Sequence, residues 1–267
     1  MSEALPAGWD AHVHVFDAAA PLRGGHYRPA TRPLAEIEAE AARHGVGHLV
    51  LVQPSVYGHD NALLLQALAR TPGRHRGVAV LAGDESDATL DAMHAAGVRG
   101  ARLNLVSPVG EAADLATRFA TLAPRLAARG WHLQWYAPRA ALPAIAALHA
   151  RSPVPAVLDH LAGLDAATPD DDAAWVALAA LANAGAWVKL SGWYRLGATA
   201  PYAPLLPQAR RVAALFGERL VWGSDWPHTA FAPDALPPYA TLWQPVVDAL
   251  GATAAQGLRD RPPEIYR

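Results

Sequence analysis

Short apolar runs rich in β-branched residues alternate with longer Ala- and Leu-rich stretches along this chain, and no other sequence feature constrains the fold as strongly. Eight runs are expected to form strands: Asp10–Val15, His48–Gln53, Gly77–Leu81, Arg99–Asn104, His132–Tyr136, Pro155–Asp159, Ala186–Leu190 and Leu220–Ser224. Eight stretches are expected to form helices: Leu34–His44, Asn61–Arg70, Asp87–Ala96, Glu111–Arg129, Leu142–Ala150, Asp171–Ala184, Leu205–Phe216 and Leu242–Leu250. Eight consecutive βα units predict an α/β protein with a single (β/α)₈ TIM-type barrel over residues 1–267.

An open, doubly wound sheet is the alternative arrangement for strands that alternate with helices. The barrel is favoured by the number of units and because no Gly-x-Gly-x-x-Gly turn follows any expected strand. Gly45, Gly97, Gly130 and Gly185 each stand between an expected helix and the next strand. Glycine at such positions is typical of helix C-termini that lead into strands.

The composition excludes several classes of function. Hydrophobic residues make up 52% of the chain, which is enough for a large core, and the formal net charge of −2 gives no basic footprint for nucleic acid or an anionic membrane. The absence of cysteine excludes thiolate zinc sites and cysteine nucleophiles. The most apolar long stretch, Ala173–Leu190, contains Lys189 and is better explained by a helix and a strand than by a membrane span.

The first residues, MSEALPAGWD, lack the basic and apolar regions of a secretory signal. We therefore expect a cytoplasmic protein that acts on a small molecule, with no nucleic-acid or membrane partner. Assembly into a homo-oligomer is left open.

The candidate catalytic residues stand where the expected strands end, because barrel enzymes hold their active sites at the C-terminal ends of the strands. His12 and His14 lie two positions apart on the first strand and therefore face the same side. Asp159 and His160 close the sixth strand. Alternation places only one of these two inward, and we favour His160, with Asp159 as a residue that orients a histidine.

Asp225 follows the eighth strand and lies between Trp222 and Trp226. A partly apolar pocket of this kind would raise the pKa of the carboxyl group and suit it to general acid–base catalysis. Each signal also has a structural explanation, such as hydrogen-bonded core histidines or a turn aspartate. Together they place His12, His14, His160 and Asp225 at one barrel mouth.

Several segments resemble the amidohydrolase superfamily, and within it the amidohydrolase-2 branch that contains 2-pyrone-4,6-dicarboxylate lactonase and sugar lactonases. They are His12-Val-His14-Val-Phe-Asp17, Val52-Gln53-Pro-Ser55, Gly58-His-Asp60-Asn61, Gly-Val-Arg-Gly-Ala-Arg102-Leu-Asn104, Val-Leu-Asp-His160 and Trp-Gly-Ser-Asp225-Trp-Pro-His228. The resemblance runs along nearly the whole chain.

The resemblance implies roles for individual residues. Asp225 matches the aspartate that activates water, and His12, His14 and His160 match histidines that bind a metal or polarise the substrate carbonyl. Arg102 matches a contact to a substrate carboxylate. The remaining substrate-binding positions are Tyr27, Ser55, Tyr136 and Arg195.

The chain also departs from the wider superfamily. Its expected fourth strand shows Arg102 and Asn104 where a bridging lysine would stand, and the fifth ends in Gln134-Trp135-Tyr136 without a histidine. A two-metal site is therefore not expected. Two versions remain open: one divalent ion, zinc by its preference for nitrogen and oxygen ligands, on His12, His14, His160 and Asp225, or catalysis without metal, as in the pyrone lactonases. Ser107-Pro108-Val109 lacks the basic character that the dicarboxylate lactonase has there, which puts a doubly carboxylated substrate in doubt.

The sequence thus predicts a hydrolase that opens a small, carboxylate-bearing lactone, with Asp225 activating water. Two alternatives stay open at this point. The first is a metal-dependent, non-oxidative decarboxylase of the same branch, and the second is a barrel that binds a ligand without catalysis.

Overall fold

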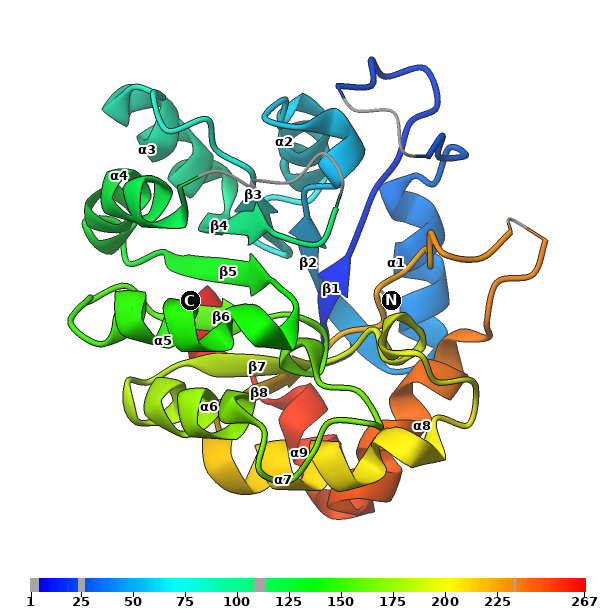
Figure 1. Cartoon of the computed structure of the whole chain (residues 1–267). Helices are drawn as coiled ribbons and strands as arrows, with labels where there is room; N and C mark the ends of the chain where they lie inside the picture. The colour runs from blue at the N-terminus through cyan, green and yellow to red at the C-terminus, as the bar shows by residue number, and fades with distance from the viewer. Residues whose placement is uncertain (1–4, 24–26, 108–113, 233) are drawn as a thin grey trace.

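In the computed structural model, which describes residues 5–23, 27–107, 114–232 and 234–267, parallel strands follow one another in chain order around a barrel (Figure 1). The eight strands of this described part are β1 (Gly8–Val13), β2 (Val46–Val52), β3 (Arg76–Ala79), β4 (Val98–Asn104), β5 (His132–Tyr136), β6 (Ala156–Leu158), β7 (Trp187–Leu190) and β8 (Leu220–Trp222). The predicted (β/α)₈ barrel is confirmed. Strand ends differ from the expected ones by up to two residues, because side-chain patterns do not show where ladder hydrogen bonds stop.

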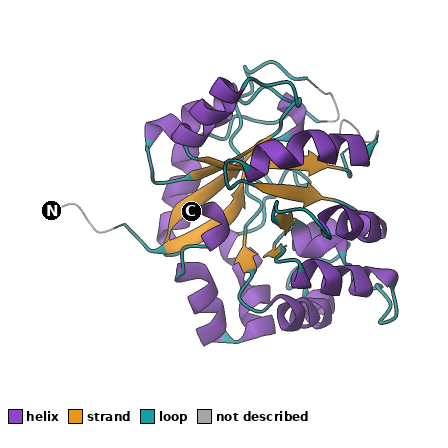
Figure 2. Ribbon diagram, turned by 90° about the vertical axis from the view of Figure 1, so that its left-hand side faces the viewer, coloured by secondary structure: helices purple, strands orange, loops and turns teal. Residues whose placement is uncertain are grey.

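Helices surround the strands on the outside of the barrel (Figure 2). They are α1 (Leu34–Arg43), α2 (Ala62–Arg70), α3 (Asp87–Ala96), α4 (Leu115–Ala127), α5 (Leu142–His149), α6 (Ala173–Asn183), α7 (Leu206–Phe216), α8 (Tyr239–Leu250) and α9 (Ala252–Asp260). The start expected for α4, at Glu111, lies outside the described residues. The expectation that the series ends at Leu250 was wrong, since α9 follows after Gly251. None of the described helices is long and apolar enough to cross a bilayer.

The expected glycine turns are present. Gly45, Gly97, Gly130 and Gly185 all have positive φ angles, from 64° at Gly130 to 108° at Gly97. Side chains with a Cβ rarely adopt this left-handed backbone. These glycines therefore turn the chain from each helix into the strand that begins directly afterwards.

The barrel closes between β1 and the segment after β8. The backbone amide of His14 donates to the Trp226 carbonyl at 2.8 Å, and the Asp225 amide donates to the His12 carbonyl at 2.8 Å. Gly223 permits this approach, since a Cβ there would lie 2.5 Å from the Cβ of His12. Closure thus places Asp225 directly beside the first strand.

Asp10 and His12 lie two positions apart on β1, and the pairing of β1 with β2 shifts register between Asp10 and Val13. Asp10 accepts hydrogen bonds from the Ser224 amide and from the hydroxyl of Tyr239 on α8, at 2.9 and 2.8 Å. His12 instead contacts Asp159 at the barrel mouth. β1 thus contacts α8 through Asp10 and the segment after β6 through His12.

Gly223→Ala is expected to destabilise the protein by roughly 1–3 kcal/mol, the usual range for overpacking, because the added methyl would push β1 from β8. The measurement is the free energy of unfolding in denaturant. Gly257→Ala in α9 is the control, since a Cβ there meets nothing within 4 Å. That control should gain about 0.5–1 kcal/mol from helix propensity. Equal stability of the Gly223→Ala variant and the parent would contradict the role given to Gly223.

Candidate active site

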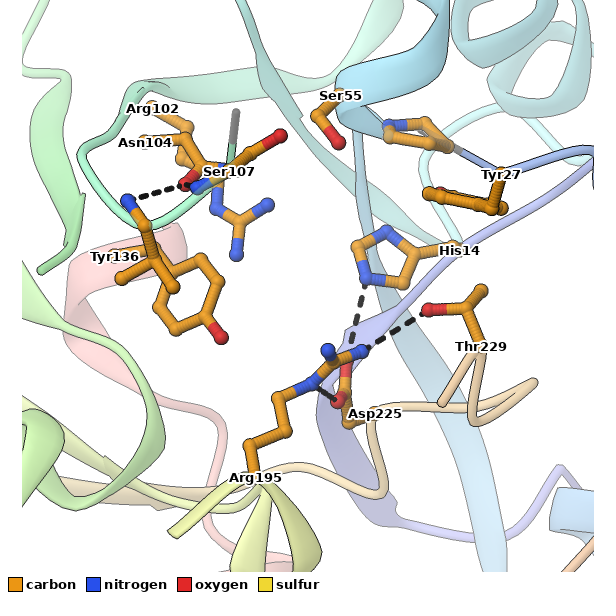
Figure 3. Close-up of a pocket in the computed structure, with 12 residues that line it drawn as sticks. His14, Tyr27, Ser55, Arg102, Asn104, Ser107, Tyr136, Arg195, Asp225 and Thr229 are labelled. Atoms are coloured by element: carbon orange, nitrogen blue, oxygen red, sulfur yellow. Dashed lines mark hydrogen bonds and ion pairs between the residues drawn. The ribbon is translucent and has the colours of Figure 1, made fainter. Parts of the chain in front are cut away.

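A pocket of about 200 Å³ opens at the C-terminal ends of the strands (Figure 3). Its lining contains all five predicted substrate-binding residues together with His14 and Asp225. The lining residues are His14, Tyr27, Pro54, Ser55, Arg102, Asn104, Val106, Ser107, Tyr136, Arg195, Asp225 and Thr229. The other two predicted catalytic residues, His12 and His160, are buried and also face Asp225.

Asp225 is the residue on which the three histidines converge. Its Oδ1 lies 3.3 Å from His14 Nε2 and 3.7 Å from His12 Nε2, and its Oδ2 lies 3.9 Å from His160 Nε2. Its backbone is left-handed, with a φ of 61°, which is strained for a residue with a side chain. The tight turn after β8 therefore aims the carboxylate back over the barrel mouth.

The second oxygen of Asp225 is held from another element. A short 3₁₀ helix after β7, η4 (Trp193–Leu196), brings the Tyr194 hydroxyl to 2.6 Å from Oδ2 and places Arg195 Nε on the same oxygen. Arg195 also donates from a terminal nitrogen to Thr229 Oγ1 at 3.2 Å. Arg195 was predicted as a substrate-binding residue, whereas Tyr194 was missed.

The sequence pattern predicted that only one of Asp159 and His160 faces inward, and this prediction was wrong. Asp159 is extended, but His160 has a φ of 48°, and the left-handed backbone breaks the alternation of the strand. Both side chains therefore reach the site. His160 Nδ1 contacts Ser191 Oγ at 3.0 Å, which leaves Nε2 directed at Asp225.

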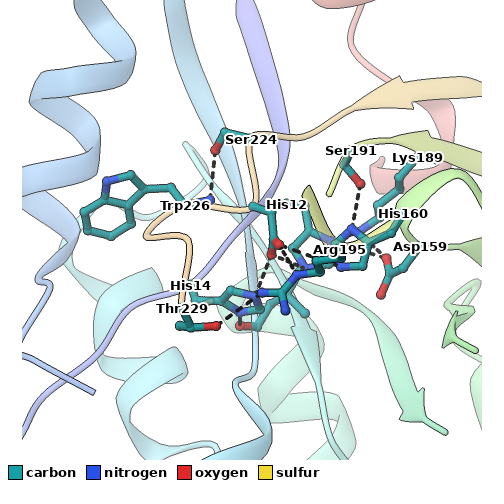
Figure 4. Close-up of polar contacts among 12 residues, drawn as sticks. His12, His14, Asp159, His160, Lys189, Ser191, Arg195, Ser224, Trp226 and Thr229 are labelled. Atoms are coloured by element: carbon teal, nitrogen blue, oxygen red, sulfur yellow. Dashed lines mark hydrogen bonds and ion pairs between the residues drawn. The ribbon is translucent and has the colours of Figure 1, made fainter. Parts of the chain in front are cut away.

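Asp159 is the centre of a buried charge cluster beneath the pocket (Figure 4). Its Oδ2 accepts from Arg102 Nε at 2.9 Å and from Gln134 Nε2 at 3.0 Å. Its Oδ1 lies 3.2 Å from His12 Nδ1 and 3.4 Å from Lys189 Nζ. The sequence showed no bridging lysine on the fourth strand, and the lysine that enters the site comes from β7 instead.

Lys189 is fully buried and has three further contacts. It donates to the Ala11 carbonyl at 2.9 Å and to Gln134 Oε1 at 2.8 Å, and lies 3.3 Å from His12 Nδ1. Burial lowers its pKa to about 8. Strand alternation could have identified it, because Val188 and Leu190 pack in the core outside the sheet and Lys189 must then face inward.

The expectation that apolar surroundings raise the pKa of Asp225 was wrong. Burial alone would raise it, but Arg195 and the histidines outweigh burial and hold the pKa well below its usual value. The two tryptophans do not enclose the carboxylate: Trp222 bonds to the Leu242 carbonyl of α8, and Trp226 points away from the cluster (Figure 4). Asp225 is therefore a carboxylate in the free protein.

His12 and His160 are neutral, because for these two groups burial prevails over the nearby carboxylates. Burial, followed by the charge of Lys189, lowers the pKa of His12 well below its usual value. Burial lowers the pKa of His160 to about 3. A neutral imidazole carries one N–H donor and one nitrogen lone pair, so it can polarise a carbonyl through the first or hold a metal through the second.

Three of the four predicted metal ligands fit a divalent ion. One ligand atom each from His12, His160 and Asp225 lies within 4.8 Å of the others. Two buried atoms in this group, His12 Nε2 and Asp225 Oδ1, have no hydrogen-bond partner among the described residues. His14 does not belong to the group, and its Nδ1 is engaged by the Val52 carbonyl at 2.8 Å. Two nitrogen ligands and a carboxylate suit zinc.

The two arginines of the pocket enter from opposite walls (Figure 3). Arg102 comes from β4 and uses Nε on Asp159, and its two terminal nitrogens have no hydrogen-bond partner in the described part of the chain. The guanidinium lies 5.0 Å from the ring centre of Tyr136. The pocket thus presents a free, forked pair of donors of the kind that binds carboxylates.

The chain is similar to several known proteins in sequence and in fold. A family model described as Amidohydrolase matches residues 9–249. A 2-pyrone-4,6-dicarboxylate hydrolase from Comamonas testosteroni is 33% identical over 84% of this chain and 78% of its own length. A 4-sulfomuconolactone hydrolase from Rhizobium radiobacter is 30% identical over 89% of this chain and 82% of its own. A crystal structure of a probable 2-pyrone-4,6-dicarboxylic acid hydrolase from Acinetobacter baumannii, with citric acid bound, has a TM-score of 0.79 at 26% identity and covers 95% of this chain and 96% of that one.

Asp159→Asn is expected to lower the free energy of unfolding by roughly 3–5 kcal/mol at pH 7, because Lys189 and Arg102 would lose their shared buried counter-charge. Lys189 and Arg102 hold the pKa of Asp159 well below its usual value, although burial opposes this. The stabilisation is therefore fully present above the unfolded-state pKa of about 3.9 and is lost as the pH falls below it. Denaturant unfolding at pH 7 and at pH 3–4 measures the difference.

The control is Glu218→Gln, which removes an exposed ion pair with Arg261 and should leave stability unchanged within error. A loss for Asp159→Asn that is no greater than for this control would show that the cluster does not stabilise the fold.

Proposed function

Because this chain belongs to the amidohydrolase family and is a hydrolase, we propose that it opens the ring ester of a small lactone that carries a carboxylate group. The observation that carries the proposal is a carboxylate, Asp225, held among three histidines at one end of a pocket with Arg102 at the other. The names of the relatives favour hydrolysis of lactones over the decarboxylation that the sequence left open.

Asp225 would act as the general base. Its Oδ1 faces the histidines, and within the described residues it accepts no hydrogen bond from a protein donor. A water molecule between this oxygen and a lactone carbonyl would lose a proton to Asp225 as its oxygen attacks the carbonyl carbon. When the tetrahedral intermediate collapses, Asp225 returns the proton to the ring oxygen, and the product is a hydroxy acid.

The histidines would stabilise the charge that develops on the carbonyl oxygen. His14 and His160 reach Asp225 from different strands, and Tyr136 packs its ring edge-on against His160 at 4.8 Å between ring centres. N–H donors aimed at an oxyanion in a buried site each contribute roughly 3 kcal/mol to catalysis. The Val52 carbonyl engages Nδ1 of His14 and the Ser191 hydroxyl engages Nδ1 of His160, which keeps these rings in fixed orientations.

Arg102 would anchor the substrate carboxylate. Its Nε is committed to Asp159, so the terminal nitrogens are held over the pocket in a fixed direction. The citric acid bound by the Acinetobacter protein shows that a structural relative accepts a carboxylate ligand. Tyr27 and Ser55, on the opposite wall, would contact the ring.

A divalent ion, if this chain uses one, would be held by His12, His160 and Asp225. When bound, such an ion polarises a carbonyl or lowers the pKa of a bound water.

Asp225→Asn is expected to lower kcat for lactone hydrolysis by roughly 100-fold or more, because the amide keeps the shape but cannot accept the proton. The assay is a panel of lactones with and without a carboxylate. Asp165→Asn is the control, since Asp165 pairs with Arg139 outside the pocket. Activity of the Asp225→Asn variant within tenfold of the parent would exclude Asp225 as the base.

Zinc binding by the parent protein is expected to weaken about tenfold or more in His160→Ala, because one of three convergent ligands is lost. Isothermal titration calorimetry gives the affinity, with His44→Ala as the control, since His44 pairs with Glu40 and is not among the residues that line the pocket. Equal affinity in both variants would exclude these ligands.

Elemental analysis of protein purified without added metal tests separately whether catalysis needs a metal ion. Full activity with sub-stoichiometric metal would exclude a catalytic ion.

A further inference from the structure

The two carboxylate oxygens of Asp225 lie in different environments. Its Oδ1 faces His12 and His14, whereas its Oδ2 carries both donors of η4, the Tyr194 hydroxyl and Arg195 Nε. Two donors on one oxygen, one of them a cation, stabilise the charged form of the acid and weaken it as a base. In the free protein, the base is therefore restrained by the element that follows β7.

Arg195 also belongs to the wall of the substrate pocket. One terminal nitrogen bonds to Thr229 Oγ1 at 3.2 Å, and the other has no hydrogen-bond partner among the described residues. The guanidinium faces Arg102 across the pocket (Figure 3). An anionic group placed between the two arginines would compete with Asp225 for the Arg195 guanidinium, whereas a neutral group would not.

Only the side chain of Arg195 has to move for such an exchange. Trp193, at the start of η4, is fully buried and donates from its indole nitrogen to the Leu242 carbonyl of α8 at 3.0 Å. This contact anchors the backbone of η4. Rotation about the long Arg195 side chain can then shift its donors from Asp225 to the pocket.

We propose that Arg195 makes hydrolysis conditional on an anionic group in the substrate: the guanidinium that restrains Asp225 in the free protein transfers to the substrate anion and frees Asp225 to take a proton from water. This inference rests on the proposed lactonase function and extends it to substrate selection. A carboxylate on the lactone then raises kcat as well as affinity. A neutral lactone of the same ring size binds but turns over slowly, because Arg195 stays on Asp225.

The test compares a lactone carboxylate with its uncharged carboxamide in three proteins: the parent, Arg195→Gln and Arg102→Gln. The parent should prefer the carboxylate in kcat by roughly 100-fold. Arg195→Gln should lose this preference and raise kcat for the carboxamide about tenfold or more above the parent. Arg102→Gln removes a predicted carboxylate contact but leaves Arg195 on Asp225, so this comparison variant should raise KM for the carboxylate and should not raise kcat for the carboxamide. Melting temperatures confirm that each variant is folded.

If the Arg195→Gln variant loses activity on both lactones equally, the inference about Arg195 is overturned, whereas the proposed lactonase function is not. A parent protein that hydrolyses neither lactone would overturn the proposed function. In that case, NMR can still test whether Arg195 moves from Asp225 to a bound anion. The Nε–H resonance of Arg195 is identified by its loss in the Arg195→Gln variant. A non-hydrolysable cyclic ether carboxylate should shift this resonance strongly and its carboxamide should not; equal shifts, or none, would overturn the exchange.

Discussion

The arrangement of the side chains in the site depends on the contacts of one buried carboxylate, that of Asp159. It joins Arg102 of β4, Lys189 of β7 and His12 of β1, three strands that are not neighbours in the barrel. Buried charges are costly unless they are paired, and removing one partner leaves the others uncompensated. The four groups must therefore stay together, and they form the buried floor of the pocket. His12, which is predicted to be catalytic, takes its orientation from this floor.

The charge balance above that floor explains why the site suits an anion. Three cations, Arg102, Lys189 and Arg195, face two carboxylates, Asp159 and Asp225, while burial keeps His12 and His160 neutral. The described residues around the pocket thus carry an excess of positive charge on buried or largely buried side chains, where electrostatic interactions are strong. A carboxylate on the proposed substrate would restore the balance. Recognition of the substrate and control of the base can then use the same groups.

The barrel could be predicted because its signal is repeated eight times and because each repeat has the hydrophobic period of a strand or a helix. His12, His14, His160 and Asp225 could be predicted because parallel strands bring their C-terminal ends to one mouth. The contacts of the residues next to them could not be predicted from the sequence in the same way. Strand periodicity assumes an extended backbone, and it failed where His160 turns left-handed and Asp159 enters the site as well.

The sequence by itself determined the order of the strands, the positions of the polar residues at their ends and the membership of a hydrolase family. Only the tertiary structure decided what those residues touch. Trp222 and Trp226 lie near Asp225 in sequence, but Arg195 and Tyr194 from the preceding βα loop contact its carboxylate. Although burial would raise the pKa of Asp225, Arg195 and the histidines lower it. The physical reason is that electrostatic interactions depend on distance in space, and barrel closure brings together charges that lie far apart along the chain.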